Sequence, residues 1–543
     1  MKKILIVVSL FCVVLLIAIA RRDFWYPDEP DMAEITSHML RSGDWLRLQL
    51  YNKLFADYPP LFFWLAAALG SIAGLSEMVL RLPTAASAAA LVLLTALWTK
   101  KRFGRESAFW TALVMATMSQ FVWQAVNMHV DMLFALLMAA SIFAYDMIRD
   151  CGKPSRRIML LCASGLLMGL AALTKGPAGI ALPCGILAFG HIINREYSLL
   201  KRLTLAGAAS ILVFGTWAYV YAAQAGGSNL FYFIYEQNIT RFLTGHSHLR
   251  PWYSHIVNIW PDLLPWSLFL PFALVHAWKN RSDRSNLLVL LWFAVTFTFF
   301  TISRSKRQVY LLPLYPAAAA IIGCFVSNLV SGLAERRTRI FRVAVLPVGV
   351  LLATLGLVIP FLLPMLQREF AGSQGLVAPL AVLSVIAVAG GVSIVVWLRR
   401  GQSNKAIYAL PVTAAGICVV AFGWLLPCLD GSLSAKDDAV WLASEQIEEE
   451  GEVLGCLRPI QRLHKESSSL SFYGNFRVEV YSEDHEIEEY MKRQPGDIFL
   501  IRREDIAWLE SRMSYTIDIV KKIRIGGDRF YAVMLSPASA SKT

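Results

Sequence analysis

The chain has 543 residues, of which 56% are hydrophobic and only 17% are charged, and its formal net charge is +12. Soluble proteins carry about 25% charged residues, so this composition excludes a soluble enzyme, a disordered tail and a small disulfide-stapled secreted module. The eight cysteines show no CxxC or zinc-finger spacing and are expected to be buried apolar side chains. A basic excess in a chain with long apolar runs is typical of the cytoplasmic loops of a membrane protein rather than of nucleic-acid binding.

Thirteen apolar runs are of near-spanning length. The first follows Met1-Lys2-Lys3 and is longer than the core of a signal peptide, so we expect an uncleaved span there. The short run 60–75 follows a Pro-Pro pair and is expected to lie at the membrane interface. The other twelve predicted spans are 80–99, 107–125, 130–148, 158–173, 177–193, 203–222, 257–278, 287–302, 309–331, 343–365, 376–398 and 406–429.

Lys and Arg are concentrated in alternate loops between these runs. If the N-terminus is cytoplasmic, every loop that should lie in the cytoplasm is basic, from Lys100-Lys101-Arg102 to Arg399-Arg400. Cytoplasmic loops carry an excess of Lys and Arg, so this pattern predicts a cytoplasmic N-terminus. Thirteen spans then place everything after Leu429 outside the cytoplasm.

The C-terminal segment 430–543 changes character, because its charges are dense. Expected helical stretches (438–450, 484–493 and 505–513) alternate there with β-rich runs (453–457, 476–481, 498–501, 516–523 and 530–535). This alternation predicts a small α/β domain. It contains no phosphate loop or dinucleotide fingerprint, which favours a supporting or docking role. The expected organisation is therefore a helical membrane domain over 1–429, with its first outer loop at 21–79, and a soluble α/β domain over 430–543.

The first outer loop contains three acids within four residues, Asp28, Glu29 and Asp31. Carboxylates this close raise one another's pKa or bind a cation. Either outcome suits acid–base chemistry or metal-assisted transfer. The alternative is structural: Asp28 precedes a proline and an amphipathic stretch, as a residue that caps a helix does.

Basic residues also occur on the outer side, where few are expected. Lys175 ends one apolar run, and it either snorkels to the interface or offers a charge to a lipid phosphate. Arg304, Lys306 and Arg307 lie together in one short loop between spans. Inserting three cations there is costly, and a bound phosphate or pyrophosphate would neutralise them.

The long outer segment 223–256 carries Arg241, His246 and His248. A His-x-His pair with a distant carboxylate is a weak metal signal, since two loop histidines are more often solvated than ligating. Taken together, the outer groups predict a site with acids on one wall and cations on the other. An anionic lipid-phosphate donor fits such a site, and a transporter of an anionic solute fits it less well because we see no inverted repeat.

These residues carry a resemblance to a known family. The motifs that carry it are Trp25-Tyr26-Pro27-Asp28-Glu29-Pro30-Asp31, Ser42-Gly43-Asp44-Trp45, Leu173-Thr174-Lys175-Gly176, Asn238-Ile239-Thr240-Arg241-Phe242, Pro251-Trp252-Tyr253, Leu264-Pro265-Trp266 and Ser305-Lys306-Arg307-Gln308. In these motifs the chain resembles the aminoarabinose (4-amino-4-deoxy-L-arabinose) lipid A transferase-like family of C-type glycosyltransferases, which are related to the dolichyl-phosphate-mannose protein mannosyltransferases. The likeness spans nearly the whole membrane part in the same order.

The resemblance implies an inverting glycosyltransferase of the bacterial inner membrane that takes a sugar from a polyprenyl (undecaprenyl) phosphate at the periplasmic face. The sugar would be aminoarabinose-like or another pentose or hexose, and the acceptor lipid A or another envelope glycolipid. Asp28 matches the catalytic carboxylate of the family, with Glu29 beside it. Four cations match positions that line the donor phosphate region: Lys175, Arg241, Lys306 and Arg307.

The resemblance also implies a divalent metal, zinc or magnesium or manganese. Asp57 stands where the family commonly has the Glu of a Glu-Lys-Pro motif, which would join His246 or His248 at the metal. Tyr58 replaces the lysine of that motif, a departure at a phosphate contact. Two alternatives stay open: a protein O-glycosyltransferase of the same fold, and a lipid or solute transporter.

Overall fold

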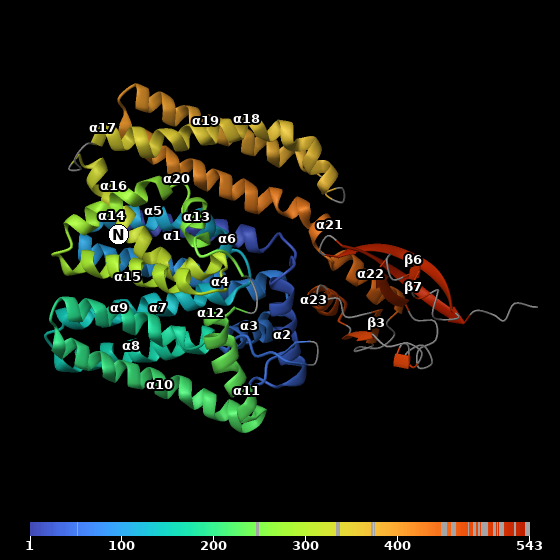
Figure 1. Cartoon of the computed structure of the whole chain (residues 1–543). Coiled ribbons are helices and arrows are strands. Elements are labelled where there is room, and N and C mark those ends of the chain that lie inside the picture. Colours follow the sequence, from blue (N-terminus) through green and yellow to red (C-terminus); the bar gives the residue numbers. More distant parts are fainter. Residues whose placement is uncertain are drawn as a thin grey trace, which may run out of the picture.

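The protein is described by a computed structural model. The model describes the chain except residues 51–52, 246–248, 333–336, 371–372, 374, 447–452, 458–462, 476, 482–484, 487–488, 490–497, 503–505, 508, 510–514, 526–527 and 538–543. In this described part, ten helical segments are long and apolar enough to cross a membrane. They lie side by side in one bundle, with a mixed sheet beyond one end of it (Figure 1).

Of the ten long segments, four join consecutive elements and six are single helices. They consist of α1 (Lys2–Ile19), α4 (Glu77–Phe103), α7 (Val130–Asp146) with η1 (Met147–Asp150), α8 (Pro154–Lys175), α10 (Tyr197–Ala225), α15 (Arg284–Ile302), η4 (Gln308–Leu314) with α16 (Tyr315–Val330), α17 (Arg337–Ile340) with η5 (Phe341–Val345) and α18 (Leu346–Glu369), α19 (Val377–Arg399), and α20 (Ser403–Val420) with η6 (Ala421–Leu425), η7 (Pro427–Leu429) and α21 (Asp430–Leu433).

Three of the thirteen predicted runs do not form one long helix. The run 107–125 is split into α5 (Arg105–Ala116) and α6 (Ser119–Ala125). The run 257–278 is split into α13 (Ser254–Asp262), η3 (Ser267–Phe269) and α14 (Leu270–Lys279). These two breaks support each other, because the backbone N–H of Ser119 donates to the carbonyl oxygen of Leu264 at 3.0 Å. The third run forms the shorter apolar helix α9 (Ala178–Ile193).

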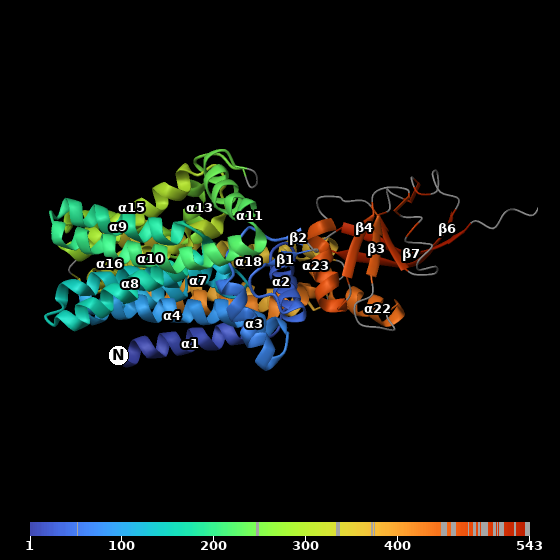
Figure 2. The same ribbon diagram turned by 90° about the horizontal axis from the view of Figure 1, so that it is seen from below.

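The basic loops meet at one end of the bundle. Their side chains form ion pairs between different helices, Arg102 with Asp146 at 2.7 Å and both Arg149 and Arg284 with Glu196 at 2.6 and 2.9 Å. We call this the basic end. The opposite end carries the sheet and α2 (Glu29–Ser42), and we call it the sheet end (Figure 2).

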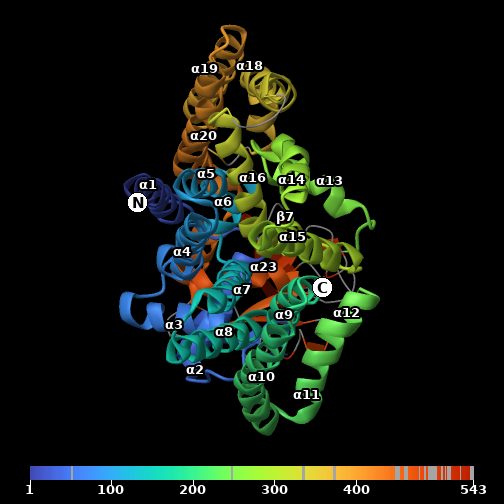
Figure 3. The same cartoon turned by 90° about the vertical axis from the view of Figure 1, so that its left-hand side faces the viewer.

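Helices α18, α19 and α20 project from one side of the bundle (Figure 3). Small residues let α18 and α19 approach closely, since a Cβ atom on Gly391 would lie 2.4 Å from the carbonyl oxygen of Gly349. This backbone contact is the type of helix packing that membranes favour.

The C-terminal segment contains a five-stranded sheet in the order β4-β3-β5-β7-β6. Strand β3 pairs in parallel with β4 and β5, whereas β7 is antiparallel to β5 and β6. The predicted α/β character is confirmed, although the domain boundary at 430 stays a prediction and most of 484–493 lies outside the described residues. The elements are α22 (Lys436–Gln446), β3 (Val453–Leu457), α23 (Leu463–Gly474), β4 (Arg477–Tyr481), β5 (Ile498–Arg502), β6 (Tyr515–Ile525) and β7 (Asp528–Pro537).

Helix α2 connects the bundle to the C-terminal segment. It begins after Asp28, has Pro30 in its first turn where no N–H is needed, and ends at Gly43 in the left-handed conformation (φ 69°). Asp31 accepts a hydrogen bond from Ser468 of α23. Just before α2, the backbone N–H of Phe24 donates to the hydroxyl of Tyr473 at 2.8 Å. The chain segments before and after Asp28 are therefore both held by contacts with α23.

The remaining elements lie at the sheet end. A short hairpin of β1 (Gln49–Leu50) and β2 (Lys53–Leu54) precedes α3 (Leu61–Ala73). After α10 the chain continues through α11 (Gly227–Phe231), the π-helical η2 (Tyr232–Thr240) and α12 (Arg241–Leu243).

Candidate active site

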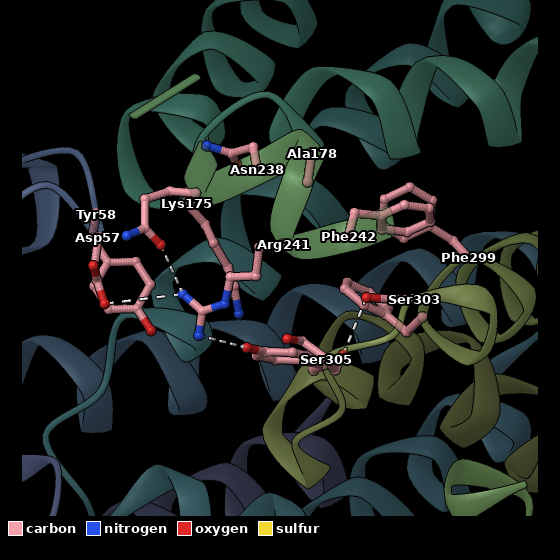
Figure 4. A pocket seen from close by; sticks show the side chains of 13 residues that line it. Asp57, Tyr58, Lys175, Ala178, Asn238, Arg241, Phe242, Phe299, Ser303 and Ser305 are labelled. Carbon is pink, nitrogen blue, oxygen red and sulfur yellow. Dashed lines mark hydrogen bonds and ion pairs between the residues drawn. The ribbon is translucent and has the colours of Figure 1, made fainter. Parts of the chain in front are cut away.

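A cavity of about 110 Å³ opens at the sheet end. Its walls come from the loop before α3, the junction of α8 and α9, the segment η2–α12, the end of α15 and the loop 303–310 (Figure 4). One part of the lining is polar and charged, and another is formed by phenylalanines. The lining residues are Asp57, Tyr58, Lys175, Ala178, Gln237, Asn238, Arg241, Phe242, Phe299, Phe300, Ser303, Ser305 and Tyr310.

Arg241 lies in the middle of the polar lining (Figure 4). Its guanidinium donates to the Tyr310 hydroxyl and to the Gln237 side-chain oxygen, both at 3.3 Å, and lies 4.0 Å from the Asp57 carboxylate. Burial opposes the charge, but the neighbouring Tyr310, Tyr58 and Asp57 outweigh it and raise the pKa of Arg241. Arg241 is therefore a permanent cation, and its long contact to Asp57 leaves it able to bind an anion in the cavity.

Lys175 reaches the cavity from the last residue of α8. The helix ends there because Gly176 has a positive φ of 84°, and a Cβ atom at that position would lie 2.7 Å from the Asn238 side-chain oxygen. The ammonium of Lys175 pairs with Asp131 and lies 4.5 Å from the centre of the Tyr310 ring. Lys175 and Arg241 thus place two cations on one cavity.

Asp28 lies beside this cavity, in the centre of a charged cluster. Its carboxylate pairs with the Arg307 guanidinium, and its Oδ2 lies 3.9 Å from the Nε2 of His129. Burial lowers and the Asp28 charge raises the pKa of Arg307, and the net effect is a raised pKa. The Asp28 side chain is 32% exposed, so the carboxylate is accessible to a substrate while it pairs with Arg307.

Glu29 is separated from the cavity although it is the next residue. Its carboxylate is only 5% exposed and pairs with Arg81 at 2.7 Å and Arg22 at 2.8 Å, and it also accepts the backbone N–H of Met128 at 2.8 Å. Burial alone would raise the pKa of Glu29, but the two guanidiniums outweigh it and lower the pKa. The structure therefore places Glu29 in a buried ion-pair cluster, not beside Asp28 in the site.

Lys306 and Arg307 are neighbours in the loop 303–310, but their side chains contact different parts of the protein. Arg307 reaches Asp28, whereas Lys306 is 3% exposed and its ammonium donates to the carbonyl oxygen of Ser303. Burial lowers the pKa of Lys306. Three of the four predicted phosphate contacts, Lys175, Arg241 and Arg307, thus lie at or beside the cavity, and the fourth is directed into the protein.

The predicted metal ligands are only partly described. Asp57 lines the cavity and faces Arg241, while His246 and His248 lie outside the described residues. Among the residues that the structure describes, no three His, Cys, Asp or Glu side chains lie close enough to bind one metal ion. The metal site therefore stays a prediction.

Sequence reasoning missed two residues of the cluster, His129 and Asp131. The Nδ1 of His129 lies 2.7 Å from the Asp131 carboxylate, and Asp131 in turn pairs with Lys175. Both residues precede or begin an apolar run, and an acid at the start of a membrane span is a signal of function in its own right. That signal was present at 129–131 and could have identified them.

A family model described as dolichyl-phosphate-mannose-protein mannosyltransferase matches residues 57–219. Two curated relatives are named undecaprenyl phosphate-alpha-4-amino-4-deoxy-L-arabinose arabinosyl transferase. The one from Pectobacterium carotovorum is 28% identical over 376 residues, 66% of each chain. The one from Pseudomonas fluorescens is 26% identical over 338 residues, 62% of this chain and 58% of its own length. The matched regions thus span a little under two thirds of these relatives.

Among solved structures, the crystal structure of ArnT from Cupriavidus metallidurans bound to undecaprenyl phosphate is similar to this chain over almost its whole length. The match has a TM-score of 0.79 at 22% identity and covers 99% of this chain and 98% of that one. The fold of a multi-pass membrane protein with a C-terminal sheet is therefore common to both. The predicted resemblance is confirmed, and this chain has the ArnT-like C-type glycosyltransferase fold, related to that of the dolichyl-phosphate-mannose protein mannosyltransferases.

Proposed function

We propose that the protein is a membrane glycosyltransferase that moves a sugar from undecaprenyl phosphate to lipid A or another envelope glycolipid. The observation that carries this proposal is that the accessible Asp28 carboxylate and its partner Arg307 lie beside a cavity that Lys175 and Arg241 line at the sheet end. The names of the curated relatives support the undecaprenyl-phosphate donor and the aminoarabinose sugar.

The cavity has the two surfaces that a polyprenyl-phosphate sugar needs. Arg241 supplies a fixed positive charge for the phosphate and Lys175, which also pairs with Asp131, supplies a second donor. Charge-assisted hydrogen bonds are the strongest contacts available to a phosphate. Phe242, Phe299 and Phe300 supply an apolar wall for the first prenyl unit. A phosphate held in this way is a good leaving group, because the cations neutralise the charge that develops on it.

The transfer itself needs little more than placement. An acceptor oxygen held in line behind the sugar carbon would displace the phosphate in one step and invert that carbon. Asp28, beside the cavity and held by Arg307, is the group that would accept a proton from the acceptor or orient it. We assign catalysis to Asp28 and a supporting role to Glu29.

The charge distribution supports an orientation. The basic end would face the cytoplasm of a bacterial inner membrane, since Lys and Arg favour that side, and the sheet end and the cavity would then face the periplasm. The N-terminus of α1 would then be cytoplasmic and the C-terminal sheet periplasmic. The predicted divalent metal at Asp57 is compatible with this orientation, and no step above depends on it.

A second candidate is protein O-glycosylation with the same chemistry. It is favoured by the family model, whose description names a protein mannosyltransferase and whose match includes Asp57, Tyr58 and Lys175. The two candidates differ in the acceptor only, so one experiment separates them.

The test is a transfer assay with purified protein in nanodiscs and a panel of undecaprenyl-phosphate sugars, beginning with the aminoarabinose donor. Acceptors are lipid A and a periplasmic protein extract, and products are identified by mass spectrometry. We expect transfer to lipid A, loss of transfer in Asp28→Asn, and retention in Asp44→Asn, whose carboxylate instead pairs with Arg47 at 2.6 Å. Absence of transfer with every donor would refute the proposal, and glycosylated protein without modified lipid would favour the second candidate.

A further inference from the structure

An open groove lies between α19 and α20, two of the helices that project from the side of the bundle (Figure 3). Its volume is about 630 Å³. Most of its lining is apolar, and among the lining residues that the structure describes Lys405 is the charged one. The groove shares no described lining residue with the cavity at the sheet end. It is therefore a second candidate binding site, separate from the first.

The packing of the two helices leaves the groove open. A Cβ atom on Gly390 of α19 would overlap the side chain of Thr413 of α20, so the two backbones approach closely at the floor of the groove. Nearer the basic end, the ring of Tyr408 packs on Trp110 of α5, with 4.8 Å between the ring centres. This contact holds Tyr408 as a wall against the bundle, and the space in front of it is free for a ligand.

The length of the groove matches one leaflet of a bilayer. Lys405 lies in the first turn of α20, next to the turn that joins the helices at the basic end, where the N–H of Gln402 donates to the carbonyl oxygen of Trp397 at 2.8 Å. From Lys405 to Gly416, the other end of the lining, α20 rises by about 16 Å at about 1.5 Å per residue. The hydrocarbon core of a membrane is about 30 Å thick, so the groove extends through roughly half of it.

The open side of the groove faces the lipid. Val412, which lines it, is 71% exposed, and Tyr408 is 40% exposed. Both helices are long and apolar enough to cross the membrane, so the surroundings of these side chains are acyl chains rather than water. An empty apolar groove would lose the dispersion contacts of its walls. An acyl chain of the surrounding leaflet would restore them.

Three cations occur where the groove reaches the basic end. Arg399 and Arg400 end α19, Lys405 begins α20, and all three side chains are exposed. In the part of the chain that the structure describes, none of the three forms an ion pair with a carboxylate. Arg102 at the same end differs, because it pairs with Asp146 at 2.7 Å. The three charges beside the groove are thus available to an anion from outside the protein.

We propose that this groove binds an anionic phospholipid of the leaflet at the basic end, with one acyl chain between α19 and α20 and the phosphate beside Lys405. Basic pockets between membrane helices bind anionic head groups, and ammonium and guanidinium groups form strong hydrogen bonds to phosphate. Trp397 and Tyr408 line the groove near these charges, and such rings favour the head-group region. A zwitterionic lipid carries its own cation, which the three positive charges repel. The proposal does not depend on the reaction at the sheet end.

The first experiment measures the selectivity for the head group. The full chain in detergent is titrated with phosphatidylglycerol or phosphatidylethanolamine of identical acyl chains, and bound lipid is counted by native mass spectrometry. We expect tighter binding of phosphatidylglycerol, weakened about fivefold for each charge removed in Lys405→Gln and in the triple variant Arg399→Gln/Arg400→Gln/Lys405→Gln. The control is Lys153→Gln, which removes an exposed cation before α8 and should leave the affinity unchanged.

The second experiment fills the groove. Ala389 lines it and is exposed, so Ala389→Trp places a large ring in the acyl-chain position without disturbing the core. Val392 is 47% exposed at a similar depth of α19 but is not among the described lining residues, so Val392→Trp is the matched control. We expect loss of the preferential binding of phosphatidylglycerol in Ala389→Trp and its retention in Val392→Trp.

Each arm has an outcome that overturns the proposal. Equal affinity for the two lipids, or unchanged affinity in the triple variant, would refute the anionic head group. Unchanged binding in Ala389→Trp would place the lipid outside the groove. Displacement of phosphatidylglycerol by equimolar undecaprenyl phosphate would assign the groove to that lipid, and a dimer lost in Ala389→Trp would assign it to a second copy of the chain. If the triple variant does not fold, salt provides the same test, because the preference should shrink between 0.1 and 1 M as the Debye length falls from about 10 Å to about 3 Å.

Discussion

Replacing Glu29 by glutamine tests whether the residue next to Asp28 is structural. The carboxylate of Glu29 accepts from the Nε of Arg81 at 2.7 Å and from the Nη2 atoms of Arg81 and Arg22, both at 2.8 Å. It also accepts the N–H of Met128 at 2.8 Å. Glutamine keeps the size of the side chain, but it removes the charge and one acceptor oxygen. Two buried guanidiniums then lose the carboxylate that pairs with both of them.

The expected loss is large because the group is almost fully buried. Breaking a buried ion pair by removing one partner costs about 3–5 kcal/mol, whereas an exposed pair contributes about 0–1 kcal/mol. The pH dependence has a definite sign, since the pKa of Glu29 is lowered in the folded protein. Its stabilisation is fully present above about pH 4.3, the range of an unfolded glutamate, and is lost as the pH falls through the lowered folded-state pKa.

The measurement is denaturant-induced unfolding in detergent, followed by tryptophan fluorescence. The control is Glu106→Gln, which removes the exposed pair between Glu106 and Lys3, whose side chains are 62% and 64% exposed. We expect a loss of about 3–5 kcal/mol for Glu29→Gln and at most about 1 kcal/mol for the control. Equal losses for the two variants would refute the reasoning. A fully stable Glu29→Gln that no longer transfers sugar would restore the catalytic role predicted from its position beside Asp28.

Three further predictions concern the cavity and the docking of α2. Arg241→Gln should weaken binding of undecaprenyl phosphate about 10-fold or more, since a charge-assisted hydrogen bond contributes about 1.5–3 kcal/mol; unchanged affinity by native mass spectrometry would contradict this. Gly176→Ala should destabilise the protein by about 1–3 kcal/mol in unfolding experiments, because φ is positive there and the new Cβ would meet Asn238; a neutral effect would show that the turn relaxes. Tyr473→Phe should leave the N–H of Phe24 without its partner and cost about 1–3 kcal/mol, with faster hydrogen exchange at Phe24; unchanged exchange would argue against it.

Hydrophobicity predicts the long spans well, because nothing but an apolar surface is stable in lipid and the runs are uninterrupted. It does not predict the breaks at 117–118 and 263–266. Both lie inside apolar runs, and the hydrogen bonds that stabilise them join segments more than a hundred residues apart, as between Ser119 and Leu264. The strands of the C-terminal sheet were predicted from their β-rich composition, while α23, which starts at Leu463, was not.

The candidate site shows the same division. The outer-face charges Asp28, Lys175, Arg241 and Arg307 were recognised because a charge near an apolar run is conspicuous, and the structure brings them together. Composition could not tell that Lys306, adjacent to Arg307, is directed into the protein. Neighbouring residues of a loop face different ways, and only the packing of the loop decides which one meets the cavity.

Helix α2 is in contact with both parts of the molecule. At the start of the helix, Glu29 pairs with Arg81 in the bundle. On the sheet side, Asp31 accepts a hydrogen bond from Ser468, and Arg41 donates one to Asn475. A chimera that takes the C-terminal sheet from a relative would thus need matching substitutions along this helix. Variation in the sheet and in the loop that bears Asp28 should accordingly be correlated between species, even though none of the lining residues described for the cavity belongs to the sheet.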